Sequence, residues 1–169
     1  MVIRTATVED VEQIALLLRH YADQGLLLPR SRQSICENLL SFYVIEEAGH
    51  VYGTGALHVL GDDLAEIRSL AIAQNAQGKG YGRVLVDTLF QRAQELKIPR
   101  VLALTYQEAF FSRCGFQVVE KQNLHQKIWK DCINCKKFPA CDEIAMIRET
   151  GYKPVLTPWI ESPLYNVQS

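Results

Sequence analysis

The sequence predicts one α/β domain, in which a mixed β-sheet is flanked by helices. Short apolar runs typical of strands alternate with longer segments whose apolar residues recur every three or four positions, as they do on one face of a helix. At 169 residues, of which 48% are hydrophobic and 22% charged, the chain can bury the core of one such domain. It contains no internal repeat and no low-complexity segment.

The first part of the chain predicts a strand and two helices. Residues 2–6 form a strand-like run, and Thr7 is a suitable N-cap for a helix that Gly25 ends. The apolar positions of this helix are Val11, Ile14, Leu17, Leu18 and Tyr21. After a loop over residues 26–30, Ser31 caps a second helix, whose apolar positions are Ile35, Leu39 and Leu40.

The rest of the chain predicts strands around a third, longer helix. Residues 42–73 predict three strands, with turns at 48–49 and 61–63. A helix follows, and its apolar face consists of Tyr81, Leu85, Leu89, Ala93 and Leu96. The later elements are a short helix ended by Gly115 and strands at 100–105, 116–120 and 143–149.

These elements place the domain at residues 1–150. Residues 121–142 are rich in cysteine and lysine and show little periodicity, so we expect a cysteine-rich insert there. Residues 151–169 hold three of the six prolines and predict an extended C-terminal arm.

Composition and charge exclude several classes of partner. The formal net charge of −1 argues against a nucleic-acid surface and against a polybasic membrane patch. No apolar run is long enough to span a membrane, and the N-terminal residues lack the apolar core of a signal peptide. We therefore expect a cytoplasmic protein whose five cysteines are mostly reduced.

Three glycines at alternate positions stand where the third helix must begin, although glycine weakens helices. A turn over Gly78, Gly80 and Gly82 exposes several backbone N–H groups beside the positive end of the helix dipole, which suits phosphate or pyrophosphate. The spacing matches neither the G-x-G-x-x-G dinucleotide pattern nor the P-loop. The alternative is a glycine-rich turn without a ligand.

The segment Gln77-Gly78-Lys79-Gly80-Tyr81-Gly82 resembles the Q/R-x-x-G-x-G/A signature of the GNAT acetyltransferase superfamily. The strand AEIRSLAI before it and the segment FFSRCGF after it extend the resemblance over about residues 2–120. It implies a mostly antiparallel, splayed sheet and acetyl-CoA as co-substrate, with the pyrophosphate on the glycine loop and the pantetheine arm on the preceding strand. The coenzyme site that it implies consists of Leu70, Ala71, Ile72, Gln77, Gly78, Lys79, Gly80, Tyr81, Gly82, Arg83 and Phe110.

Residues 3–35 and the segments AEIRSLAI and LALTYQEAFFSRCGF resemble, more narrowly, the acetyltransferase domain of N-acetylglutamate synthases. Long forms of these enzymes carry an amino-acid-kinase-like domain upstream, so this chain is similar to a short, stand-alone form. The resemblance implies acetylation of the α-amine of L-glutamate, the first step of arginine biosynthesis. GNAT domains often pair, which allows a homodimer.

A dicarboxylic acceptor needs cations, and arginine offers a two-pronged donor for a carboxylate. Strand alternation places Glu66, Arg68, Leu70 and Ile72 on one face, a mixture typical of a strand that lines a cleft. The predicted acceptor site consists of Arg30, Arg32, Arg68, Tyr106 and Lys127. The alternatives are a solvated helix start for Arg30 and Arg32 and a surface ion pair between Arg68 and Glu66.

The expected chemistry is direct attack of the amine on the thioester, for which a base must remove a proton from the mostly protonated α-amine. Glu66 is the first candidate for this base and Glu108 the second, while a structural ion pair is the alternative role of Glu66. A backbone N–H at Leu70 would stabilise the negative oxygen of the tetrahedral intermediate.

Many GNAT enzymes protonate the leaving thiolate with a tyrosine, at a place where this chain has Phe111. Either Tyr106 supplies the proton or the thiolate leaves without an acid. A covalent route through Cys114 is disfavoured, because no histidine is its neighbour in the sequence and burial would keep the thiol inert.

The cysteine-rich segment offers a Cys3His set for a structural zinc ion, consisting of His125, Cys132, Cys135 and Cys141. Reduced thiols packed under a loop, or a disulfide formed by oxidation, are the alternatives. Two other functions also stay open. The acceptor is glutamine, another amine or a peptide N-terminus, because basic residues of the long-form enzymes align with Asp63 and Gln107. Alternatively, the chain is a non-catalytic acyl-CoA sensor, which fits the phenylalanine at position 111.

Overall fold

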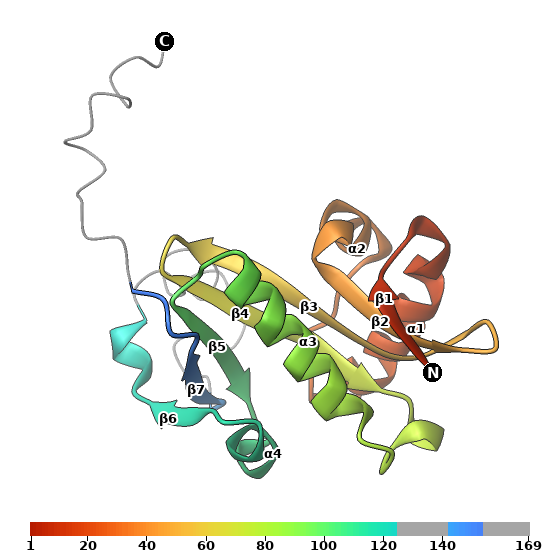
Figure 1. The fold of residues 1–169 in the computed structure, drawn as a ribbon. Helices are drawn as coiled ribbons and strands as arrows, with labels where there is room; N and C mark the ends of the chain where they lie inside the picture. The colour runs from red at the N-terminus through yellow and green to blue at the C-terminus, as the bar shows by residue number, and fades with distance from the viewer. Residues whose placement is uncertain (125–141, 154–169) are drawn as a thin grey trace.

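A computed structural model describes residues 1–124 and 142–153. Its centre is a seven-stranded sheet in the order β1-β2-β3-β4-β5-β7-β6 (Figure 1). Only β4 and β5 pair in parallel, whereas all other neighbours are antiparallel. The strands are β1 (Val2–Thr5), β2 (Phe42–Glu47), β3 (His50–Gly61), β4 (Leu64–Ile72), β5 (Arg100–Thr105), β6 (Gln117–Val119) and β7 (Ile144–Glu149). The helices are α1 (Val11–Ala22), α2 (Arg32–Glu37), α3 (Tyr81–Glu95) and α4 (Glu108–Arg113). The predicted mixed, mostly antiparallel sheet is confirmed.

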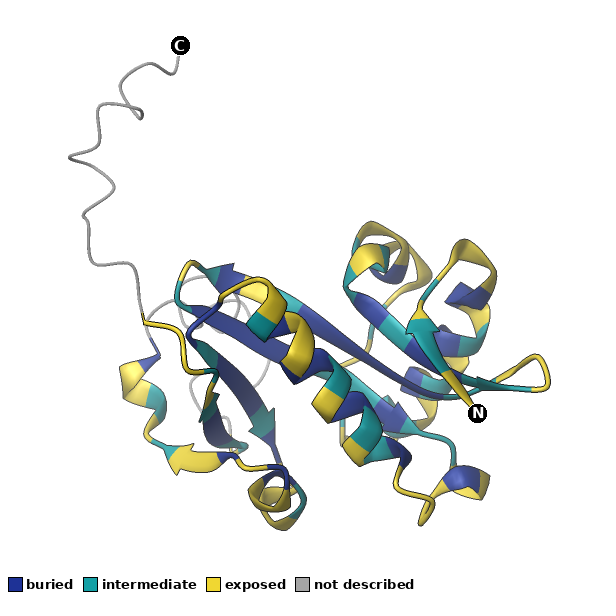
Figure 2. Cartoon of the chain, viewed as in Figure 1, coloured by how far each residue is buried: buried dark blue, intermediate teal, exposed yellow. Residues whose placement is uncertain are grey.

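Helix α3 covers one face of the sheet and turns its buried side toward β3 and β4 (Figure 2). The predicted apolar face is confirmed at Tyr81, Leu85, Leu89 and Ala93. Leu96, the C-cap residue, is 42% exposed, so its place on this face was wrongly predicted. No helix in the described part of the chain has the length and apolar character needed to cross a bilayer.

Helices α1 and α2 cover the opposite face. Their buried residues pack against β2 and β3, and include Val11, Ile14, Leu18 and Ile35. Ser31 caps α2 as predicted, because its hydroxyl accepts from the backbone N–H of Ser34 at 3.0 Å. The helix ends earlier than predicted, where the Asn38 side chain donates to the Ser34 carbonyl. Leu40 therefore lies outside the helix and is 95% exposed.

A β-bulge divides β4 into two parts. Ser69 has a φ of 55°, and the register between β3 and β4 shifts beside it. Arg68 pairs with Ala56, which packs on the α1–α2 side, whereas Leu70 and Ile72 contact the cluster around α3. The prediction that Glu66, Arg68, Leu70 and Ile72 share one face is therefore wrong, because the extra residue of the bulge reverses the alternation.

The sheet is split between β4 and β5. Their ladder runs from the pair Leu64–Arg100 to the pair Ile67–Ala103 and then ends, although both strands continue. The other edge of β5 is occupied by β7, which enters between β5 and β6 (Figure 1). Residues 68–72 of β4 thus face a gap, which is the splayed sheet that the sequence predicted.

At the far edge, β1 is tied to the turn before α1 by a buried ion pair. The Arg4 guanidinium donates to both oxygens of Asp10, at 2.7 and 2.9 Å, and the side chain of Asp10 is only 6% exposed. This bond lowers the pKa of the Asp10 carboxyl. Asp10 also accepts from the backbone N–H of Thr7 at 2.7 Å. A 3-10 turn over Val8–Asp10 follows, and α1 then begins at Val11.

Candidate active site

A cleft of about 1200 Å³ follows the gap between β4 and β5. The loop before α2, the glycine loop, the first turn of α3 and helix α4 border it. Among the described residues, four arginines line the cleft, namely Arg30, Arg68, Arg83 and Arg113. The acidic residues of the described lining are Glu66 and Glu143. Because cations outnumber anions in this described lining, it favours an anionic ligand.

The glycine loop forms one end of this cleft. Gly78 has a φ of 82°, and Gly80, the N-cap residue of α3, has a φ of 80°. A side chain would be strained in this conformation, and the space beside both Cα atoms is open. The N–H groups of the first turn of α3 have no acceptor within the helix. The loop can therefore bring backbone donors close to a phosphate at the positive end of a 15-residue helix.

Side chains from distant elements hold this loop. The Gln77 amide donates to the Tyr21 hydroxyl at 2.7 Å, and this hydroxyl donates to the Ile72 carbonyl. The Tyr81 hydroxyl donates to Glu47 on β2. Sequence reasoning placed Tyr21 on the apolar face of the first helix and missed its polar role; a hydroxyl at the edge of an apolar stripe was the available signal. The backbone of Ile72 was predicted to bond the coenzyme. Its carbonyl already accepts a hydrogen bond from the Tyr21 hydroxyl in the structure.

Most of the other predicted coenzyme residues line the cleft, whereas Lys79 is not part of the described lining. Leu70, Ala71 and Phe110 line the cleft, and a Cβ atom on Gly82 would lie 3.2 Å from the ring of Phe110. Arg83 also lines the cleft, with its Nε 3.9 Å from Asp87. Lys79 is absent from the described lining, and its Nζ lies 5.8 Å from the centre of the Tyr81 ring.

Charged side chains gather at the opposite end of the cleft, near the bulge. Glu66 is buried and accepts from the Arg68 guanidinium at 2.6 Å. His58 on β3 is the register partner of Glu66, and its Nε2 lies 3.4 Å from Nη1 of Arg30. Arg30 also donates to the Ser69 hydroxyl at 3.3 Å. The predicted Arg30, Arg68 and Glu66 thus line the same cleft, and Arg68 contacts Glu66 directly. His58 was missed, although a histidine in the otherwise apolar run GALHVL was a signal.

Other predicted acceptor residues lie elsewhere or outside the described residues. The side chain of Arg32 is 62% exposed, lies 3.6 Å from Glu12 and does not line the cleft. Tyr106 lines the cleft, and its hydroxyl donates to Asp142 at 2.7 Å. Lys127 lies outside the described residues, as does the predicted zinc set of His125, Cys132, Cys135 and Cys141. Within the described ranges, no cluster of three or more His, Cys, Asp or Glu could hold a metal ion.

The short helix α4 contributes apolar walls. Phe111 is buried, and its ring meets those of Phe110 and Phe116 edge-on. It has no group that can donate a proton, so its place offers no acid to a leaving thiolate. Burial raises the pKa of the Cys114 thiol, which argues against this cysteine as a nucleophile.

A glycine loop that opens a helix beside a sheet split between two parallel strands defines the class of this protein. The chain matches the acetyltransferase (GNAT) family over residues 9–116 and belongs to it. It is an acetyl-CoA-dependent N-acetyltransferase.

Three proteins within this family are similar to the chain, two of them by sequence and one by its solved structure. An uncharacterized N-acetyltransferase of Chlorobaculum tepidum is 40% identical over 146 residues, which are 86% of this chain and 94% of that protein. The amino-acid acetyltransferase of Mycobacterium tuberculosis is 40% identical over 122 residues, 70% of each chain. The crystal structure of N-acetylglutamate synthase from Neisseria gonorrhoeae, complexed with coenzyme A and N-acetyl-glutamate, has a TM-score of 0.78 and is 28% identical; the match covers 88% of this chain and 35% of that one.

Proposed function

We propose that this chain transfers the acetyl group of acetyl-CoA to the α-amine of L-glutamate, which is N-acetylglutamate synthase activity and the first step of arginine biosynthesis. One observation carries the proposal: β4 connects two chemically different ends of a single cleft. Arg30, Arg68 and Glu66 gather at one end, and the strand leads from there to the glycine loop of α3. The names of the similar proteins from Mycobacterium and Neisseria support the same substrate class.

The donor would bind along β4. Its diphosphate would accept hydrogen bonds from the loop around Gly78 and Gly80, and its pantetheine amides would pair with the part of β4 that β5 leaves open. This path leads the thioester toward the bulge at Ser69 and so toward Glu66. Phe110 and Leu70 would cover the arm with apolar surface and exclude water.

The acceptor would bind with its carboxylates on Arg30 and Arg68 and its amine toward Glu66. Glu66 takes a proton from the ammonium group, directly or through water, and the amine nitrogen then attacks the thioester carbon. The N–H of Leu70 stabilises the negative oxygen of the tetrahedral intermediate. The nitrogen loses its second proton to solvent, and the C–S bond breaks as the carbonyl re-forms. The thiolate takes a proton from solvent or from Tyr106, which solvent then re-protonates.

The ion pair between Arg68 and Glu66 favours a second candidate, glutamine. A side-chain carboxylate would have to compete with Glu66 for the Arg68 guanidinium, which already donates to it at 2.6 Å. A neutral amide would bind there without that competition. Arg30 lines the same cleft and brings a second guanidinium to it, which would bind the α-carboxylate that both amino acids share.

The test is an acceptor screen that follows thiol release from acetyl-CoA, with product identification by mass spectrometry. The panel contains glutamate, glutamine, aspartate and a set of simple amines, and N-acetyl-glutamate serves as the control that lacks an amine. We expect glutamate to give the highest kcat/KM. A higher value for glutamine would select the second candidate. Acetyl-CoA binding without amine-dependent thiol release would instead indicate an acyl-CoA sensor.

A further inference from the structure

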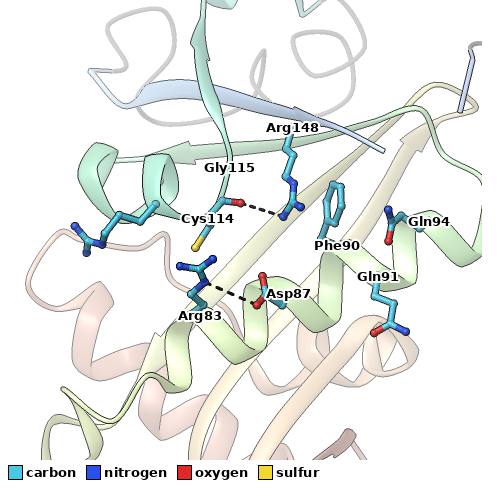
Figure 3. A pocket seen from close by; sticks show the side chains of 9 residues that line it. Arg83, Asp87, Phe90, Gln91, Gln94, Cys114, Gly115 and Arg148 are labelled. Atoms are coloured by element: carbon cyan, nitrogen blue, oxygen red, sulfur yellow. Dashed lines mark hydrogen bonds and ion pairs between the residues drawn. The ribbon is translucent and has the colours of Figure 1, made fainter. Parts of the chain in front are cut away.

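A second hollow, of about 540 Å³, lies beside the cleft between α3, the turn after α4 and β7 (Figure 3). It shares Arg83, Arg113 and Cys114 with the cleft, so the two spaces adjoin. Its described lining consists of Arg83, Asp87, Phe90, Gln91, Gln94, Arg113, Cys114, Gly115 and Arg148. Arg83 is one of the predicted coenzyme residues. The other residues that α3 and β7 contribute to this hollow have no role in the proposed reaction.

Arg148, on β7, lies at the wall of this hollow and makes two contacts there. Its Nη1 donates to the Cys114 carbonyl at 3.0 Å, and its guanidinium carbon lies 3.8 Å from the centre of the Phe90 ring (Figure 3). Gly115 has a φ of 89°, and a Cβ atom there would lie 3.2 Å from Nε of Arg148. A side chain at position 115 would press on the guanidinium, whose orientation the Cys114 carbonyl and the Phe90 ring support without a ligand.

The charge around this guanidinium is unbalanced. Arg148 is partly buried, and among the described residues no carboxylate forms an ion pair with it. Asp87, the acidic residue of the described lining, is directed to Arg83, at 3.9 Å (Figure 3). Three arginines therefore face one aspartate in a chain whose formal net charge is −1. A cation withdrawn from water without a counter-ion is unfavourable, and a bound anion would remove that cost.

The arrangement of the donors selects the kind of anion. Guanidinium groups enter from α3 and from β7, and the amides of Gln91 and Gln94 line the same space. A carboxylate has two oxygens in one plane, whereas a phosphate has three oxygens that can accept from several directions. We propose that the hollow between α3 and β7 binds a phosphate monoester, with Arg148 as one donor and Arg83 as a second one.

Such a group has two sources. One is the 3′-phosphate of CoA itself, because the hollow adjoins the cleft at Arg83, next to the glycine loop. This source rests on the proposed use of acetyl-CoA. The other is a separate phosphorylated small molecule or phosphate ion, and this source does not depend on the proposed function.

The test compares the wild-type protein with Arg148→Met, which keeps the apolar stem against Phe90 but removes the charge. The control is Arg92→Met, because Arg92, on α3, pairs with Glu95 and lines neither space. Calorimetry measures the Kd of CoA and of 3′-dephospho-CoA for each protein, and thermal unfolding measures the rise in Tm caused by inorganic phosphate. Arg83→Met, which removes the second proposed donor, is the second variant, for the case that Arg148→Met does not fold.

If CoA is the source, the wild type and Arg92→Met should bind CoA about 10-fold more tightly than 3′-dephospho-CoA, as expected for a lost charge-assisted contact, and Arg148→Met should lose that preference. If the source is a separate phosphate, inorganic phosphate should raise the Tm of the wild type and of Arg92→Met but not of Arg148→Met. The proposal is overturned if both readouts are equal in Arg148→Met and Arg92→Met. Should neither CoA nor its dephospho form bind at all, the donor assignment fails, and the phosphate measurement still decides the hollow.

Discussion

The two ends of the cleft are built from different parts of the chain. The donor end is mostly backbone: a helix start, two glycines with positive φ, and a strand edge that its neighbour leaves open. These features lie within one continuous segment, residues 68–82. The acceptor end is mostly side chains, and they come from segments far apart in the sequence, since Arg30 meets His58 across 28 positions and Ser69 across 39.

This difference teaches which changes each end tolerates. Hydrogen bonds from the backbone depend on its conformation. The end proposed for acetyl-CoA should therefore tolerate most side-chain substitutions but lose affinity when a glycine is replaced. Hydrogen bonds from side chains depend on which residue is present. A single substitution at the end proposed for the amino acid should therefore alter specificity or rate and leave the binding of acetyl-CoA unchanged. Four experiments test whether the two ends of the cleft differ in this way.

The largest effect is expected for Glu66→Gln, because the amide cannot take a proton from the acceptor amine. We expect kcat to fall by about 100-fold or more, while the KM for acetyl-CoA stays within about twofold. The loss should be largest at low pH and should shrink as the pH rises toward the pKa of the acceptor amine, where more unprotonated amine is available. Glu108→Gln, in an exposed residue outside the cleft lining, is the matched control. A loss that is equal at every pH would assign Glu66 a structural role only.

The next effect tests the donor end through glycine conformation. Gly80→Ala and Gly49→Ala replace glycines of nearly equal φ, 80° and 82°, and neither Cβ atom would meet another atom within 4 Å. Each should lower the free energy of unfolding by about 1 kcal/mol, because an αL alanine is strained. Gly80→Ala alone should raise the KM for acetyl-CoA, by about 10-fold, because its Cβ obstructs the phosphate. Equal KM values for the two variants would remove the loop from the donor site.

An effect of similar size on KM, without the loss of stability, separates Arg30 from Arg32 near the start of α2. Arg30→Met should raise the KM for the amino-acid acceptor about 10-fold and leave that for acetyl-CoA nearly unchanged, because one charge-assisted bond to a carboxylate is lost. Arg32→Met is the control, since Arg32 is exposed and directed to Glu12. If Arg32→Met has the larger effect on the acceptor KM, the acceptor end lies on the other side of α2.

The smallest effect on catalysis is expected at the ion pair of Arg4 and Asp10, which lies outside the cleft lining. Asp10→Asn should lower the free energy of unfolding at pH 7 by about 1–3 kcal/mol and change neither KM. Because the pKa of Asp10 is lowered in the folded protein, its contribution is complete above the unfolded value of about 3.9 and is lost as the pH falls through the folded value.

The measurement is urea unfolding of both proteins at neutral pH and at successively lower pH. The difference in stability should therefore shrink on acidification. Glu46→Gln, on the half-exposed partner of the same arginine, should cost less. A stability difference that grows toward low pH would contradict the assignment. A change in either KM would show that a general loss of stability affects the cleft. The KM changes expected for Gly80→Ala and Arg30→Met would then no longer identify residues that contact a substrate.

The amino-acid sequence determined the features that depend on neighbours along the chain. Spacing of apolar residues predicted α1, α3 and the strands, and the alternating glycines predicted an anion site at the start of α3, because periodicity and φ preference are local properties. Local rules failed where a local contact opposed them. The bulge at Ser69 reversed the faces of β4, and the Asn38 side chain ended α2 before Leu40.

Only the tertiary structure decided which side chains meet. Spacing could not show that β7 enters between β5 and β6, or that Arg30 rather than Arg32 lines the cleft. Nor could it show that His58 contacts Arg30 or that Tyr21 holds the glycine loop. It also could not show that Gly115 makes room for Arg148 against Phe90. The physical reason is that such contacts join residues tens of positions apart, and their geometry is set by strand order and by the packing of both faces of the sheet.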